Sequence, residues 1–274
     1  IKANIDTLFA DRIGFSRQPL FIHTEANVDT RGLKLDSLTG SAVLRDTFIE
    51  YQDESLKLDS IYIRSVIAAN QRHLILKSSY ADADLVGDFY YSTLFNDLQS
   101  LFREFQLNVK NDKQELARYY TKKENRTQEY FAAFTIKLNN INPLLTLSKT
   151  GIALSRNTTI EGKFSNGITS SLQAFTQIDT VAYLGKYFYS NELEFSGSKI
   201  RDSTTALVMF NFQSEKQKIT NVFKTKNMFS EISWDKNHID FKLDFDQDST
   251  PKNTNNFVRL QSEIDFLNDS TRIK

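Results

Sequence analysis

Alternation of apolar and polar residues runs through much of the chain and predicts a succession of β-strands. The clearest examples are Ala206 to Phe212 and Ile239 to Phe245, in which every second residue is apolar. Successive side chains of a strand point to opposite faces of a sheet, so each run has one face suited to burial. About a dozen such strands joined by short polar turns are expected, as in an antiparallel meander.

The period of the pattern changes within residues 83–105. Leu85, Gly87 and Phe89 continue a strand-like alternation. Beyond them the apolar spacing becomes helical and predicts one amphipathic helix near residues 92–107, with Ser92 or Thr93 as its N-cap. Its apolar stripe comprises Leu94, Phe95, Leu98, Leu101, Phe102 and Phe105.

The strand patterns divide the chain into three segments. Residues 1–107 read as a first meander closed by the helix, although residues 1–18 carry little pattern. Residues 108–128 read as a polar linker or helix, and residues 129–274 as a second run of strands continuous with the first, in which residues 142–145 permit a helical turn. A short repeat, LKLDS, occurs at 33–37 and again at 56–60.

Composition narrows the functional classes. The 274 residues include 34 basic and 34 acidic ones and no cysteine. Without a basic block, nucleic acid and an anionic membrane surface are not expected as the main partner. No apolar run approaches the ~20 residues that span a bilayer. Because the chain begins at Ile1 without a signal-like segment, we expect a processed protein or an internal part of a longer one.

Candidate catalytic and metal-binding residues do not form a recognisable motif. His23, His73 and His238 are scattered among predicted strands and lack metal-ligand spacing. Asp244 and the two acidic residues that follow at alternate positions, 246 and 248, open like a calcium loop but lack its later glycine and glutamate. No phosphate-binding loop, nucleophile elbow or ordered catalytic triad is present. The sequence therefore predicts neither an enzyme nor a metal or cofactor site.

The apolar face of the strands allows two interpretations. It is either the core of a closed β-sandwich or barrel, or the lining of an open trough that binds lipid. Alternation alone does not distinguish these possibilities, because both place one row of apolar side chains on one side of each strand.

Three segments of the first half carry a resemblance to a known family. They read LDSLTGSA at 35–42, SLKLDSIYI at 55–63 and DADLVGDFYYSTL at 82–94, and they resemble the middle of the translocation and assembly module family, TamB, in the AsmA-like group of bridge-like lipid transfer proteins. In the second half, NNINPLL at 139–145 and NTTIEGKF at 157–164 are similar to the point where a new run of groove strands begins.

The resemblance implies a mainly β fold, a long meander bent into a U-shaped trough (β-taco) that carries phospholipid acyl chains between two membranes without catalysis. Family members are periplasmic proteins of Gram-negative cells, anchored in the inner membrane and contacting an outer-membrane barrel protein. An alternative function in the family is the assembly of barrel proteins, for which exposed strand edges would be the working surface. A closed sandwich acting as an ordinary binding module is the remaining alternative.

On this interpretation, lipid tails would be sheltered by apolar strand residues at ~0.8 kcal/mol per buried methylene. The predicted helix would plug the trough, line it or pack on its rim. The expected lining residues are Ile22, Leu58, Leu85, Phe89, Ile136, Phe164, Phe210, Phe212, Phe241 and Phe245.

Overall fold

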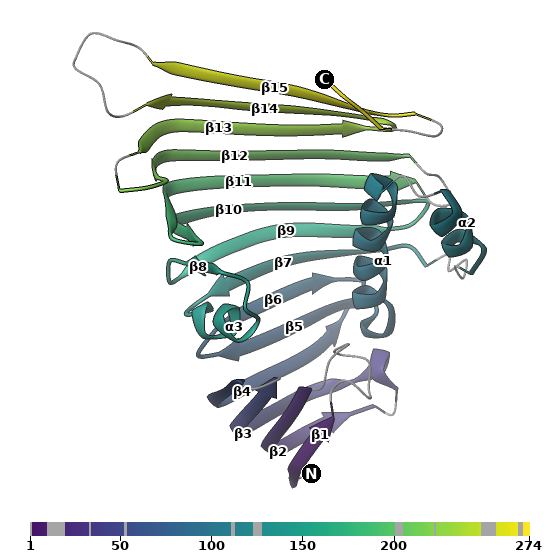
Figure 1. The fold of residues 1–274 in the computed structure, drawn as a ribbon. Helices are drawn as coiled ribbons and strands as arrows, with labels where there is room; N and C mark the ends of the chain where they lie inside the picture. Colours follow the sequence, from purple (N-terminus) through teal and green to yellow (C-terminus); the bar gives the residue numbers. More distant parts are fainter. Residues whose placement is uncertain are drawn as a thin grey trace.

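The computed structural model describes residues 2–9, 20–32, 34–51, 54–110, 113–122, 128–200, 205–221, 223–247, 256–267 and 271–274. Its strands form one antiparallel sheet (Figure 1). The strands are β1 Lys2–Phe9, β2 Leu20–Arg31, β3 Thr39–Tyr51, β4 Glu54–Ala68, β5 Gln71–Ser78, β6 Asp82–Gly87, β7 Tyr130–Leu138, β8 Ile152–Leu154, β9 Thr158–Asn166, β10 Thr169–Tyr183, β11 Lys186–Ile200, β12 Ala206–Lys218, β13 Lys224–Asp235, β14 His238–Gln247, β15 Phe257–Phe266 and β16 Thr271–Ile273. The helices are η1 Leu35–Ser37, α1 Tyr91–Lys110, α2 Lys113–Lys122 and α3 Asn142–Leu147.

The sheet is an open meander, as predicted. Neighbours in the sheet follow chain order from β1 to β16, except that β8 pairs with the far end of β10, beside β9. The first and last strands do not pair with each other, so the sheet is not closed into a barrel. It curves, and α1 and α3 lie on its concave face (Figure 1).

Helices α1 and α2 are inserted between two strands that are neighbours in the sheet, β6 and β7. The sheet therefore continues without interruption across the polar segment that separates the two strand-rich halves of the sequence. Helix α1 crosses in front of the strands (Figure 1) and packs on them through the main hydrophobic core. The buried residues of this core are Phe89, Leu94, Leu101, Phe105, Tyr130, Ala132, Phe164, Leu172, Ala206 and Trp234.

Two glycines on the concave face allow aromatic rings to lie directly on the backbone. A Cβ at Gly197 of β11 would lie 3.1 Å from the ring of Phe105 in α1. A Cβ at Gly162 of β9 would lie 2.4 Å from the ring of Phe134. The close approach of α1 to the sheet thus depends on a missing side chain at the contact.

Strands β11, β12 and β13 bend at one level, which produces a crease across the sheet. In each strand, two consecutive residues are exposed and the alternation of buried positions shifts by one. Ser190 and Asn227 have φ of 50° and 52° at these points, the left-handed conformation found at β-bulges. The exposed pairs are Tyr189 with Ser190, Glu215 with Lys216, and Lys226 with Asn227.

Buried polar side chains satisfy the backbone at the crease. Asn191 donates through Nδ2 to the carbonyls of Ile178 and Phe188, each at 2.9 Å. Thr225 Oγ1 donates to Oε1 of the buried Gln217 at 2.8 Å. Because an unpaired buried carbonyl is costly, these polar residues stabilise the bend where apolar ones would not.

The first turn of α1 differs from the prediction. Strand β6 ends at Gly87, so Phe89 is in the connection to the helix rather than in a strand. The cap is neither Ser92 nor Thr93. Instead, the carboxylate of Asp36, in η1, accepts from the Ser92 backbone N–H at 3.0 Å and from its hydroxyl at 2.5 Å. A residue 56 positions away in sequence thus caps the helix.

Other local predictions have mixed outcomes. The helical turn near Pro143 is confirmed as α3. The repeat is one of sequence only, because residues 35–37 form η1 whereas residues 56–60 lie in β4. Residues 2–9, which show little pattern, form β1 because they pair with β2 along its edge.

Candidate functional site

Mostly apolar side chains on the concave face form rows that cross the strands, with Thr176, Ser230 and Gly162 among them. Directly paired residues of neighbouring strands share a face, so a chain of pairs traces each row. One row runs Ala83, Ile136, Ile160, Thr176, Leu193, Phe212, Ser230, Leu243 and Leu260. A second runs Leu74, Leu85, Phe134, Gly162, Ala174, Phe195, Phe210, Ile232 and Phe241. The rows run across the strands, in the direction of α1 (Figure 1).

The structure brings the ten expected lining residues to the concave face, but not to one environment. Phe89 and Phe164 are 0% and 1% exposed and lie in the core beneath α1, so they contact protein rather than an open surface. Leu58 is also buried. The remaining members are only partly buried, and they are Ile22, Leu85, Ile136, Phe210, Phe212, Phe241 and Phe245.

Helix α1 has two apolar stripes where the sequence predicts one. Leu94, Leu101 and Phe105 are buried against the sheet, with Leu98 partly buried beside them. The assignment of Phe95 and Phe102 to this stripe is wrong, because Phe95 and Phe102 are 62% and 47% exposed. They form a second, exposed stripe with Val109, which is 49% exposed.

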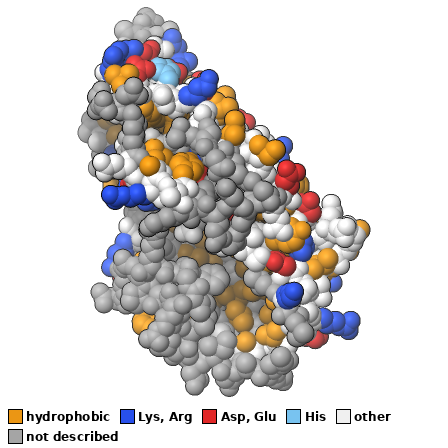
Figure 2. Space-filling model, turned by 90° about the vertical axis from the view of Figure 1, so that its right-hand side faces the viewer, with side chains coloured by type: hydrophobic (Ala, Val, Ile, Leu, Met, Phe, Trp, Pro, Cys, Tyr) orange, Lys and Arg blue, Asp and Glu red, His pale blue; other side chains and the backbone are white. Residues whose placement is uncertain are grey.

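The exposed stripe faces the middle of the concave surface. Phe95, Phe102 and Val109 are spaced by seven residues, which places them along one side of a helix. Arg103, which contacts Glu115 of α2 at 2.5 Å, lies on the other flank of α1. Figure 1 shows α2 to the right of α1, beyond the strands, so the flank with the exposed stripe is directed over the sheet. Figure 2, viewed from that right-hand side, shows hydrophobic side chains in a hollow below the centre.

A buried ion pair fixes α1 and α2 to the sheet. Lys199 Nζ of β11 lies 2.9 Å from Glu104 Oε2 of α1. The hydroxyls of Tyr119 and Tyr120, in α2, donate to the same carboxylate at 3.2 and 3.3 Å. Burial, followed by the charge of Glu104, raises the pKa of Tyr119 to about 12. This hydrogen-bonded ion pair therefore fixes the position of α1 on the sheet.

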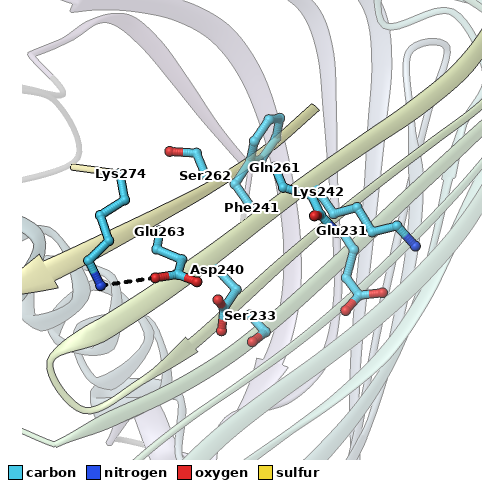
Figure 3. A pocket seen from close by; sticks show the side chains of 9 residues that line it. All are labelled: Glu231, Ser233, Asp240, Phe241, Lys242, Gln261, Ser262, Glu263 and Lys274. Carbon is cyan, nitrogen blue, oxygen red and sulfur yellow. Dashed lines mark hydrogen bonds and ion pairs between the residues drawn. The ribbon is translucent and has the colours of Figure 1, made fainter. Parts of the chain in front are cut away.

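The upper part of the outer, convex face carries a different kind of recess. Nine residues of β13, β14, β15 and the C-terminus line a space of about 470 Å³ (Figure 3). Lys274 there contacts Glu263 at 3.2 Å and Asp265 at 3.3 Å. Glu231 is paired with Lys242, and Asp240 is paired with Glu263, so the recess is lined by charged side chains of both signs, as on a solvated sheet face.

The histidines lie apart from the concave rows and from each other. His73 Nε2 contacts Asp84 at 2.9 Å, and His238 contacts Asp265 at 2.7 Å and Asp240 at 3.1 Å. His23 packs near the ring of Phe48.

The acidic residues that resemble a calcium loop are also separate. Asp244 accepts from Arg259 at 2.9 Å, and Asp248 lies outside the described residues. Within the described part of the chain, no group of three His, Asp or Glu residues is arranged to hold a metal ion.

Sequence reasoning missed several members of the concave rows. Val109, in the exposed stripe of α1, was not among the expected residues. Neither were Phe195 and Ile232 of the second row, although both have the correct alternation for a strand. Their membership follows from the cross-strand register, which a single strand pattern does not contain.

No family model, curated protein or solved structure matches the chain. Among the described helices, none combines the length and the apolar character needed to cross a membrane.

Proposed function

We propose that this protein binds phospholipid acyl chains on its concave face and lets them move along the apolar rows, without catalysing a reaction. The observation that carries the proposal is the continuity of these rows across an open sheet, with Phe210, Phe212 and Phe241 left only partly buried. A core would bury such side chains under a second layer. Each methylene sheltered here contributes ~0.8 kcal/mol, so an acyl chain is a fitting occupant.

The shape of the surface supports movement along it. The rows lie parallel to α1, whose exposed stripe of Phe95, Phe102 and Val109 adds a wall beside them. The predicted helix thus lines the trough in this proposal and does not plug it. Neighbouring positions along a row are chemically similar, so a lipid passes between sites of nearly equal affinity. Direction would be imposed from outside this chain.

The resemblance to the TamB family extends the proposal to location and partners. On this resemblance we propose a location in the periplasm of a Gram-negative cell, as part of an inner-membrane-anchored protein that carries phospholipid towards the outer membrane. An outer-membrane barrel protein would be contacted through other parts of the protein.

The test is lipid analysis by mass spectrometry of the folded, purified protein. Phe210→Asp puts a charge on the concave face, and Met209→Asp puts the same charge on the outer face of the same strand, where Met209 is exposed. We expect lipid to co-purify with the wild type and with Met209→Asp, and to be lost from a folded Phe210→Asp. A delipidated, fully folded wild type that takes up no phospholipid would overturn the proposal.

The edge of the sheet favours a second candidate, assembly of barrel proteins. Strand β16 pairs with β15 only over Ile264–Phe266. Among the described residues, the backbone groups of residues 257–262 on that edge have no strand beside them, which suits pairing with an incoming strand. Crosslinkers placed at Gln261, exposed on the outer face of the edge strand, would trap unfolded barrel polypeptide if this function holds, whereas crosslinkers at Phe210 would trap lipid if the first one does.

A further inference from the structure

Lysines that are dispersed in the sequence meet at one end of the sheet. Lys186 begins β11, Lys216 and Lys218 end β12, and Lys224 begins β13. These ends lie at the left of Figure 1, beyond the crease and opposite α1. We call these four lysines, together with Tyr187 and Tyr189, the lysine rim. Residues 186–189, 215–218 and 224–226 contain five lysines and one glutamate, although the whole chain is neutral.

The register of the strands places Lys216, Lys218, Lys224 and the two tyrosines on one surface. Lys186, next to Tyr187 in β11, lies at the same end of the sheet with its side chain on the opposite face. Lys218 of β12 is paired with Tyr187 on one side and with Lys224 on the other. Lys216 is paired with Tyr189 and Lys226 in the same way. The two tyrosine rings are stacked, with centroids 6.3 Å apart and planes 10° from parallel, and Lys218 Nζ lies 6.0 Å from the Tyr187 ring.

Folding does not explain this arrangement. Like charges directly opposite each other destabilise an antiparallel sheet, and the pair of Lys218 with Lys224 is of this kind. Lys216 faces Lys226, which has Asp246 opposite it on β14. Among the described residues, no carboxylate is within ion-pair distance of Lys186, Lys216, Lys218 or Lys224. An anionic partner would remove the repulsion.

Apolar side chains project from the turns next to these lysines. Leu184 is 66% exposed in the turn between β10 and β11, and Phe223 is exposed just before β13. Ile152 of β8 and Tyr183 of β10, which are paired, are exposed beside Leu184. Lysines interleaved with exposed leucine and aromatic side chains are typical of surfaces that bind the interface of a membrane.

We infer that the lysine rim and its apolar turns dock on the surface of a bilayer containing anionic phospholipid. The ammonium groups meet the head-group phosphates, and Leu184 and Phe223 enter the boundary between head groups and acyl chains. An acidic polypeptide would satisfy the lysines but would leave these apolar side chains in water. This surface is separate from the concave face, and its docking does not depend on the proposed lipid transport.

Flotation with vesicles tests this inference. The probe is vesicles of phosphatidylcholine containing phosphatidylglycerol, compared with phosphatidylcholine alone. The rim variant carries Lys186→Gln, Lys216→Gln, Lys218→Gln and Lys224→Gln. A matched control removes four exposed cations elsewhere, with Lys34→Gln, Arg64→Gln, Lys163→Gln and Lys236→Gln. A third variant carries Leu184→Ser and Phe223→Ser.

We expect the wild type to bind the anionic vesicles, with weaker binding as salt shortens the electrostatic range. The partition coefficient of the rim variant on anionic vesicles should fall at least about tenfold, because each lysine near an anionic surface contributes to the free energy of binding. The control variant and Phe210→Asp should bind like the wild type, and the Leu184/Phe223 variant should bind more weakly.

Three results would overturn the inference. The first is absence of wild-type binding at low salt, and the second is equal binding by the wild type and the rim variant. The third is full vesicle binding by the Leu184/Phe223 variant together with lysine-dependent binding of polyglutamate, which would assign the rim to an acidic polypeptide. Circular dichroism of each variant checks that the fold is retained.

Discussion

Lys199 of β11 and Glu104 of α1 form an ion pair of 2.9 Å in which the two side chains are only 2% and 5% exposed. Removing one partner leaves a buried charge without compensation, which costs about 3–5 kcal/mol. We expect Lys199→Met to lower the free energy of unfolding by that amount in urea denaturation.

The matched controls for this pair are Lys163→Met, an exposed lysine on the outer face, and the double variant Lys199→Met/Glu104→Met. Lys163→Met should leave the free energy of unfolding unchanged. The double variant should recover part of the lost free energy, because no charge stays buried. If Lys199→Met has the same free energy of unfolding as the wild type, the ion pair does not hold α1 in place.

Contact between Gly197 and Phe105 sets how closely α1 approaches the sheet. A Cβ at position 197 would lie 2.8 Å from Phe195 and 3.1 Å from Phe105, so Gly197→Ala forces both rings to move. Overpacking of this kind costs about 1–3 kcal/mol. We expect Gly197→Ala to lower the thermal unfolding midpoint and Phe105→Leu to lessen that loss when the two are combined. If the decreases in the thermal unfolding midpoint of the two single variants simply add in the double variant, Gly197 and Phe105 are not in contact.

Asn191 stabilises the crease. Its amide group is the donor to two backbone carbonyls, so Asn191→Leu leaves both unpaired in a buried place. The expected loss is about 1–3 kcal/mol in the free energy of unfolding. Gln213→Leu, at an exposed position of β12, is the control and should have little effect. If Asn191→Leu leaves the free energy of unfolding unchanged, the hydrogen bonds of Asn191 do not stabilise the crease.

Asp36 gives α1 a cap whose strength depends on pH. Burial acts to raise the pKa of Asp36, but hydrogen bonds from Ser92 and the nearby charge of Arg72 outweigh it, and the pKa is lowered from 3.8. The stabilisation is therefore present above this ordinary value and is lost as the pH falls through the lower folded value. We expect Asp36→Ala to cost about 1 kcal/mol at neutral pH. In urea denaturation, its difference from the wild type should vanish in acid, and a constant difference would refute the cap.

The pKa of His238 is raised, whereas that of Asp36 is lowered. Hydrogen bonds to Asp265 and then Asp240 raise the pKa of this histidine above the ordinary 6.5. Any stability it contributes is complete below that value and is lost as the pH rises through the folded pKa. NMR titration should show the raised pKa in the wild type and a value closer to 6.5 in Asp265→Asn. An unchanged histidine titration in the variant would contradict the assignment.

The amino-acid pattern was sufficient for much of this fold because alternation is a local property. It predicts the strands of residues 206–212 and 239–245, the meander and the amphipathic helix, since each depends on which side chains must leave water. It also placed Phe210, Phe212 and Phe241 on one face. It failed at Phe89, Phe95 and Phe102, because packing of α1 on the sheet decides which apolar residues are covered.

The sequence by itself determined that the chain would be rich in strands with one apolar face, because the alternation of apolar and polar residues depends only on residues that are close in sequence. Only the tertiary structure decided that the sheet stays open, that Asp36 caps α1 and that Glu104 meets Lys199. The same holds for the lysine rim, whose members have no common block in the sequence. These relationships depend on the register between strands, which is set by the folding of the whole sheet.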